Sequence, residues 1–221
     1  MKKINSYELG PGDIVSDMEL SKELGISRTP VREAIFKLIS DGILERTPTR
    51  VIVKPLTFAD IQEILQIREA LEIASVKLII DRGGLTDAQY AELCAMQQQF
   101  CTYVADSNYG DNFSNDSDFH CAIVEFSGNS RMISIFRMIN WQAQRLRVLT
   151  LFTPQRYQDT AAEHQAIIDA LHSKDISFAE SALHAHFQAT IANYAKILES
   201  PHWGRVLKGI ISMSNIADSH K

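Results

Sequence analysis

The chain has 221 residues, of which 45% are hydrophobic, and a formal net charge of −5, so it can form one or two globular domains with cores of their own. No apolar run approaches the roughly 20 residues of a membrane span, and no secretory leader opens the chain. Three cysteines without a CxxC pair disfavour a disulfide framework or a thiolate zinc site, so we expect a cytoplasmic protein.

Residues 1–56 carry nine lysines and arginines against eight acidic residues, and the rest of the chain carries 13 against 19. Neither part is strongly basic, so any contact with DNA must come from a few placed arginines. The elements expected in this segment are a helix over 17–24, a helix over 29–41, and strands over 43–45 and 50–54. Ser16 or Asp17 can cap the first helix, Gly25 ends it, and Pro30 is tolerated in the first turn of the second. This order predicts a winged helix-turn-helix domain.

Two arginines mark the start of the second expected helix. Arg28 and Arg32 are four residues apart, so both project from one face of that helix. Guanidinium groups in this position can bind guanine edges or phosphates, and the hydroxyls of Ser27 and Thr29 can add phosphate contacts. The spacing alone is equally compatible with an ordinary solvated helix face, but the turn, the capping residues and the hairpin together favour a recognition helix.

After Pro55 the pattern becomes almost continuously helical. Short segments rich in Gly, Pro, Asn or Ser separate six expected helices, over 58–82, 86–106, 111–127, 130–152, 156–172 and 175–199. Six helices of this length can close into a bundle with an interior pocket. We therefore expect a mainly α protein, with a winged helix-turn-helix domain at 1–56, an all-α six-helix effector bundle at 57–200, and a tail at 201–221 whose structure the pattern does not predict.

Three histidines and one carboxylate form a candidate metal site. Asp116 and His120 are four residues apart on one expected helix, and His164 and His186 lie on the fifth and sixth. Three imidazoles and a carboxylate suit zinc, nickel or a similar divalent cation and leave positions open for water or a ligand. His184 is only two residues from His186 and should point elsewhere. The alternative is a set of separate structural histidines.

Several motifs resemble one family. The segment 20–35, LSKELGISRTPVREAI, resembles the operator-binding segment of GntR-family repressors. The segment 64–72, ILQIREALE, resembles the first helix of the FCD effector domain found in the FadR subfamily. The run 116–120 followed by Ser-Gly-Asn at 127–129 is similar to its metal-helix motif, with Glu163-His164 and His186 where later ligands belong. The resemblance covers residues 4–199, and six effector helices resemble the VanR-type branch.

The resemblance implies a metal-bound, homodimeric regulator whose pocket accepts a small carboxylate. It implies DNA contact for Arg28 and Arg32, and we expect Ser27, Thr29 and Arg50 to contact DNA as well. The residues implied for the metal, zinc or nickel, are Asp116, His120, His164 and His186. Those expected to bind the effector are Arg68, Arg145, Arg147 and Asn129, although Arg68 with Glu72 is also compatible with an ordinary ion pair along a helix.

The function expected is that of a ligand-responsive transcriptional regulator, a repressor that binds a palindromic double-stranded DNA operator as a homodimer. One alternative is a regulator for which the metal itself is the effector. A second is a metal-dependent hydrolase with Glu163 as its acid–base group. The second has less support, because the sequence contains no HExxH, no GxSxG and no Gly-rich phosphate loop.

Overall fold

The computed structural model describes residues 2–5, 8–146 and 153–199. These residues form two compact units that divide between Thr57 and Phe58. The tail predicted over 201–221 and the expected effector residue Arg147 lie outside the described residues. None of the helices in the described ranges is both long enough and apolar enough to cross a membrane.

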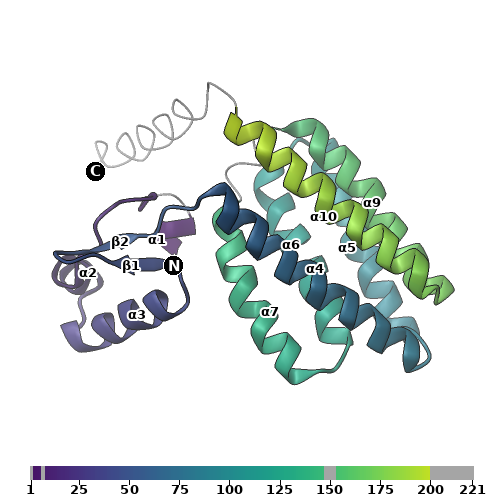
Figure 1. The fold of residues 1–221 in the computed structure, drawn as a ribbon, viewed down its shortest axis with the longest axis horizontal. Coiled ribbons are helices and arrows are strands. Elements are labelled where there is room, and N and C mark those ends of the chain that lie inside the picture. The colour runs from purple at the N-terminus through teal and green to yellow at the C-terminus, as the bar shows by residue number, and fades with distance from the viewer. Residues whose placement is uncertain (1, 6–7, 147–152, 200–221) are drawn as a thin grey trace. The chain divides into compact units, whose positions relative to one another are not determined.

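The first unit is a winged helix-turn-helix (Figure 1). Its elements are α1 (Lys2–Asn5), α2 (Asp17–Leu24), α3 (Arg28–Ser40), β1 (Leu44–Arg46) and β2 (Val51–Val53). Ser16 is the N-cap of α2, and its hydroxyl accepts a hydrogen bond from the Glu19 amide. Gly25 ends α2 in the left-handed conformation at φ 65°, which a glycine adopts without steric cost. The chain can therefore turn sharply into α3.

The hairpin is extended by a third segment that the sequence pattern did not predict. β1 and β2 pair antiparallel, with Leu44 opposite Val53, and Ile14 forms a β-bridge with Ile52. Strand and helix residues then share one core, which consists of Ile4, Val15, Val31, Ile35, Ile43, Leu44 and Val53. The apolar stripe of α3 therefore faces inward and leaves its charged residues outside.

The second unit is a helical bundle. Its elements are α4 (Phe58–Asp81), α5 (Asp87–Ala105), α6 (Tyr109–Phe126), α7 (Ser130–Ala143), the 3₁₀ turn η1 (Gln144–Leu146), α9 (Pro154–Ser173) and α10 (Ile176–Glu199). Helix α10 packs against α4 and α9, while α5 packs against α6 and α9 (Figure 1). Thr86 begins α5 with a reciprocal capping box to Gln89.

The prediction of one α-helix over 130–152 is wrong at 144–146, and its last part, 147–152, lies outside the described residues. The α-helix ends at Ala143, and η1 follows it. Ala143, at the end of α7, and Arg145 and Leu146, in η1, are all buried.

Helix α4 brings charge into the middle of the bundle. Its buried residues are Ile61, Ile64, Leu65, Arg68, Glu72, Ser75, Val76 and Ile79. Most of them recur at helical spacing and form one inward stripe. Arg68 and Glu72 lie on this stripe, although charged residues are rarely buried without partners. We therefore expect both side chains to have polar partners in the interior of the bundle.

A candidate metal centre and its neighbouring cavity

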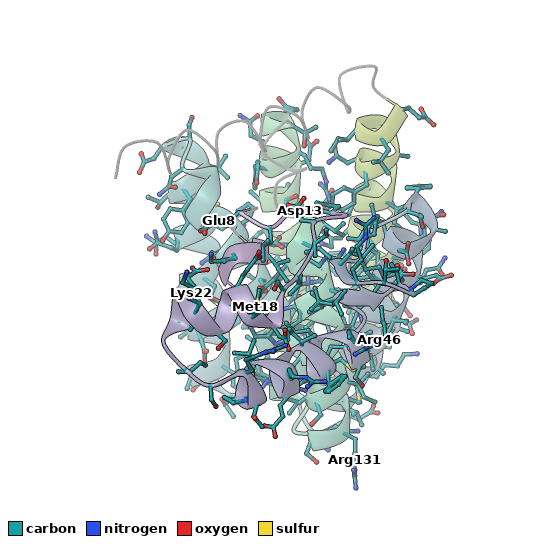
Figure 2. All side chains as sticks on the ribbon, turned by 90° about the vertical axis from the view of Figure 1, so that its left-hand side faces the viewer. Glu8, Asp13, Met18, Lys22, Arg46 and Arg131 are labelled. Atoms are coloured by element: carbon teal, nitrogen blue, oxygen red, sulfur yellow. The ribbon has the colours of Figure 1, made fainter. Side chains whose placement is uncertain are left out.

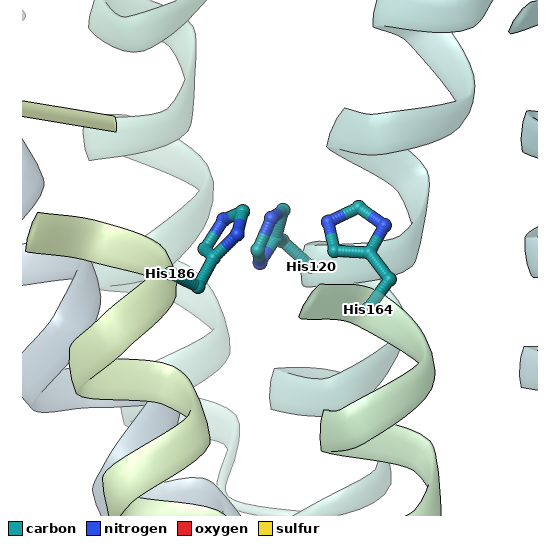
Figure 3. A group of neighbouring side chains, drawn as sticks. All are labelled: His120, His164 and His186. Atoms are coloured by element: carbon teal, nitrogen blue, oxygen red, sulfur yellow. The ribbon is translucent and has the colours of Figure 1, made fainter. Parts of the chain in front are cut away.

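Three histidines meet in the interior of the bundle. His120 of α6, His164 of α9 and His186 of α10 each offer a ring nitrogen within 4.8 Å of the others, and all three side chains are buried (Figure 3). One turn before His120, the Oδ1 atom of Asp116 lies 3.5 Å from His164 Nε2 and 3.9 Å from His120 Nε2. The three predicted histidines therefore converge on one point, and Asp116 lies beside two of them.

Two carboxylates contact the Nδ1 atoms of two of the histidines. Glu72 Oε2 lies 2.6 Å from His120 Nδ1, and Glu163 Oε2 lies 2.7 Å from His186 Nδ1. A carboxylate at Nδ1 favours the proton on that nitrogen, which leaves the lone pair of Nε2 facing the opposite direction. Carboxylates behind metal-binding histidines commonly have this role.

One ring nitrogen in the cluster lacks a hydrogen bond within the described ranges. His164 Nε2 is buried and makes no hydrogen bond with any described residue. A buried polar atom without a partner costs about 1–3 kcal/mol. A cation among the three rings and Asp116 would satisfy this nitrogen, so the donor set fits a zinc-like or nickel-like ion.

The protonation states match this donor set. Burial lowers the pKa of His120 and of His164 well below the usual value, with the positive charge of Arg68 acting in the same direction. Burial alone would raise the pKa of Glu163, but hydrogen bonds from His186 and Arg156 outweigh it and lower that pKa. The rings of His120 and His164 are therefore neutral near pH 7, the form that binds metal.

A small cavity adjoins the histidines. Its volume is about 60 Å³, which corresponds to roughly four to six water-sized groups. Its polar lining includes Arg68, Asp116, His120, Arg156, Thr160, His186, Thr190 and Asn193. The rest of the lining is largely apolar and includes Leu65, Ala143, Leu146 and Phe187. The cavity can therefore accept a short molecule with one anionic end.

Arg68 is the lining residue with the clearest unmet hydrogen-bonding capacity. Its guanidinium lies near the rings of Phe136 and Phe187, 5.5 and 5.7 Å from their centroids. Its Nη2 atom is 3.5 Å from Glu72, but neither Nε nor Nη2 makes a hydrogen bond with a described residue. These two nitrogens lie on one edge of the guanidinium, which can bind a carboxylate with two parallel hydrogen bonds.

Arg156 is a second arginine at the cavity, and its guanidinium already makes hydrogen bonds with neighbouring side chains. It donates to both oxygens of Glu163 at 2.7 Å and to Thr190 Oγ1 at 2.9 Å. Sequence reasoning missed it, because Glu163 is seven residues away and Thr190 lies on another helix. It also missed the support of His120 by Glu72, since only the pair Arg68–Glu72 has helical spacing.

Other expected site residues lie elsewhere. Asn129 is not among the residues that line the cavity, because its Oδ1 caps α7 by accepting from the amides of Arg131 and Met132. Arg145 is buried in η1 and is likewise absent from the lining. His184 points away from the histidine cluster, as expected, and lies 2.7 Å from Glu69.

The residues expected to contact DNA are exposed at one end of α3 and in the hairpin. Ser27, Arg28, Thr29, Arg32 and Arg50 are all exposed, and Ser27 makes no capping hydrogen bond. A groove of about 400 Å³ between α3 and the hairpin includes Arg32 and Arg50 in its lining. Arg46, a residue that sequence reasoning did not single out, lines the same groove and is labelled in Figure 2.

Comparison with known proteins matches two families. Residues 1–52 match the bacterial regulatory proteins of the gntR family, and residues 63–189 match the FCD domain. An HTH-type transcriptional regulator of Bacillus subtilis, YdhC, is 27% identical over 203 residues, which cover 90% of this chain and 88% of that protein. A Paenarthrobacter nicotinovorans protein, named a probable D-xylose utilization operon transcriptional repressor, is 30% identical over 184 residues, which cover 80% and 77%.

Solved structures show the same fold. The structure of Escherichia coli McbR/YncC has a TM-score of 0.72 at 24% identity and covers 88% of this chain and 92% of that one. A Rhodococcus regulator has a TM-score of 0.71 at 23% identity, with coverage of 90% and 93%. At these identities the likeness concerns the arrangement of the helices and strands.

The metal-free protein should become less stable on acidification because of its buried histidines. In the folded state His164 has a pKa well below that of an unfolded histidine, about 6.5, so its contribution is lost as the pH falls through that value. We expect the melting temperature, measured in EDTA, to fall less between pH 7 and pH 5 in His164→Gln than in the unaltered protein.

The exposed His184 provides the control for this measurement. His184→Gln removes an imidazole that is in contact with solvent, so it tests whether the effect is specific to the buried ring. Equal pH dependence in His164→Gln and the unaltered protein would show that the buried ring does not titrate as described.

Proposed function

Since the chain belongs to the gntR family of bacterial regulatory proteins and carries an FCD domain, we propose that this DNA-binding transcriptional regulator is a homodimeric repressor controlled by a small organic acid. The acid binds in the cavity beside a divalent metal. The observation that carries the sensing part is Arg68, a buried guanidinium next to three convergent histidines, with two nitrogens that make no hydrogen bond with the described residues. The repressor part is supported by relatives that are named repressors.

A second copy of the chain fits an exposed apolar stripe on α7. Ile135, Met138 and Trp141 follow one another at intervals of three residues and are 47%, 41% and 44% exposed. Contiguous exposed apolar side chains are uncommon on a monomer, and a stripe of this kind can pair with its own copy about a two-fold axis. A palindromic operator requires the same symmetry, because two recognition helices read its two half-sites.

Arg32→Ala should abolish sequence-specific DNA binding. A palindromic duplex selected from a randomised pool by the unaltered protein serves as the probe in a mobility-shift assay. Each lost arginine contact is worth about 1–3 kcal/mol, and the dimer loses two, so we expect binding at least about 30-fold weaker.

Lys37→Ala is the matched control, since Lys37 lies in the last turn of the same helix and pairs with Asp41. It should bind the duplex within about threefold of the unaltered protein. Retained specific binding by Arg32→Ala would contradict the recognition-helix assignment, and sedimentation of one chain per palindromic duplex would contradict the homodimer.

Asp116, His120, His164 and His186 would hold the metal, which supplies a positive charge and open positions for a carboxylate oxygen. Elemental analysis should find one divalent ion per chain after equilibration with zinc or nickel and dialysis. Chelation should then lower the melting temperature, because an ion that binds only the folded state stabilises it.

Two histidine substitutions test whether the metal binds at the buried cluster or elsewhere on the protein. His186→Gln should retain less than one tenth of the metal, whereas His184→Gln, at an exposed histidine on the same helix, should retain all of it. The site is wrong if the unaltered protein binds no ion, or if both variants lose it equally.

The cavity should distinguish a carboxylate from its neutral analogue. In a thermal-shift screen of metal-loaded protein with short mono- and dicarboxylates, at least one acid should raise the melting temperature, and its amide should not. Arg68→Lys keeps the charge but lacks the edge with two nitrogen donors. We therefore expect its affinity for that acid to be at least about tenfold lower, with metal content unchanged.

A screen in which no acid shifts the transition would contradict carboxylate sensing. The alternative, in which the metal itself is the effector, predicts instead that operator affinity follows metal occupancy without any acid. The hydrolase alternative has less support from the geometry, since both oxygens of Glu163 already accept hydrogen bonds from Arg156.

A further inference from the structure

One carboxylate of the winged helix-turn-helix unit binds both arginines of the recognition face. Arg28 Nη2 donates to the two carboxylate oxygens of Asp17, at 2.9 and 3.0 Å. Arg32 Nε lies 3.7 Å from Asp17 Oδ2. Asp17 begins α2, whereas both arginines lie on α3, so the contact crosses between the two helices of the motif.

The stability of α2 does not explain this contact. The N-cap of α2 is Ser16, whose hydroxyl already accepts from the Glu19 amide. The side chains of Arg28 and Arg32 are 58% and 61% exposed, and ion pairs at this exposure contribute little to folding. An aspartate in the first turn also interacts favourably with the helix dipole, but that interaction needs neither arginine.

The contact has a larger effect on DNA binding than on folding. A negative charge among the groups that meet DNA opposes sequence-independent attraction to phosphates. At the same time it restricts two long side chains that otherwise lose rotamer freedom only on binding. A carboxylate shared by two arginines therefore weakens non-specific binding and favours the arginine geometry that reads base edges.

We infer that Asp17 is a positioning residue that sets the specificity of DNA binding by holding Arg28 and Arg32 and by cancelling part of their charge. This inference rests on the proposed function, in which both arginines contact DNA. Met18 and Lys22, which follow on α2, are exposed and are labelled in Figure 2. Asp17 is partly buried and lines the groove beside α3, as Arg32 does.

The test compares two DNA probes, the selected palindromic duplex and a scrambled duplex of the same composition. For Asp17→Ala we expect binding to the scrambled duplex to be about threefold to tenfold tighter, and the ratio of specific to non-specific affinity to fall at least tenfold. The logarithmic salt dependence of non-specific binding should also become steeper. A helix-stabilising role alone would change the melting temperature and leave the affinity ratio unaltered.

Glu23→Ala is the matched control, because Glu23 lies on the same helix and pairs with Lys3 rather than with a recognition arginine. It should leave the affinity ratio within about twofold. Asp17→Asn removes the charge with little change in size, and it replaces the alanine variant if that variant loses its thermal transition.

An unchanged ratio in Asp17→Ala, or in Asp17→Asn where that variant is used, would overturn the inference. Arg28→Ala and Arg32→Ala, measured with the same probes, distinguish its failure from that of the proposed function. If both arginine variants keep full specific binding, the proposed recognition face is wrong. If they lose specific binding while the Asp17 variants behave as the unaltered protein, only the role of Asp17 is wrong.

Discussion

The interior of the helical bundle is organised around one buried carboxylate. Glu72 is inaccessible to solvent, with Arg68 3.5 Å from one oxygen and His120 2.6 Å from the other. Burial raises the pKa of Glu72 to about 7 against the opposing effect of Arg68. A carboxyl group buried in this way is costly to ionise unless opposite charges or hydrogen-bond donors lie beside it. The histidine cluster and Arg68 are therefore adjacent because His120 and Arg68 both contact Glu72.

The two units use charge in different ways. In the bundle, Arg68, Glu72 and the histidines are removed from water, so each unmet hydrogen bond is costly and favours a ligand. In the winged helix-turn-helix unit, Arg28 and Arg32 remain largely in water, where ion pairs contribute little to folding. Their orientation therefore matters for recognition rather than for stability. Under the proposed function, the bundle detects a small anion and the winged helix-turn-helix unit selects a DNA sequence.

The sequence predicts those features that depend on local spacing. Asp116 and His120 are one helical turn apart, and the six helices and the recognition helix follow from apolar periodicity and turn residues. It does not predict contacts between distant segments, such as Glu72 with His120 across 48 residues. The resemblance predicts Asn129 at the effector site, but Asn129 precedes the first residue of α7 and caps its backbone instead. The prediction for Arg145 depends on a regular helix, but that helix ends two residues earlier, at Ala143.

The central claim is that the three histidines and Asp116 form one metal site next to a carboxylate-binding arginine. X-ray diffraction from crystals of the zinc-loaded protein, collected on both sides of the zinc absorption edge, tests it most directly. We expect one anomalous peak per chain, about 2.0–2.1 Å from Nε2 of His120, His164 and His186. A peak elsewhere in the bundle, or the absence of a peak at this position in fully zinc-equilibrated crystals, would contradict the claim.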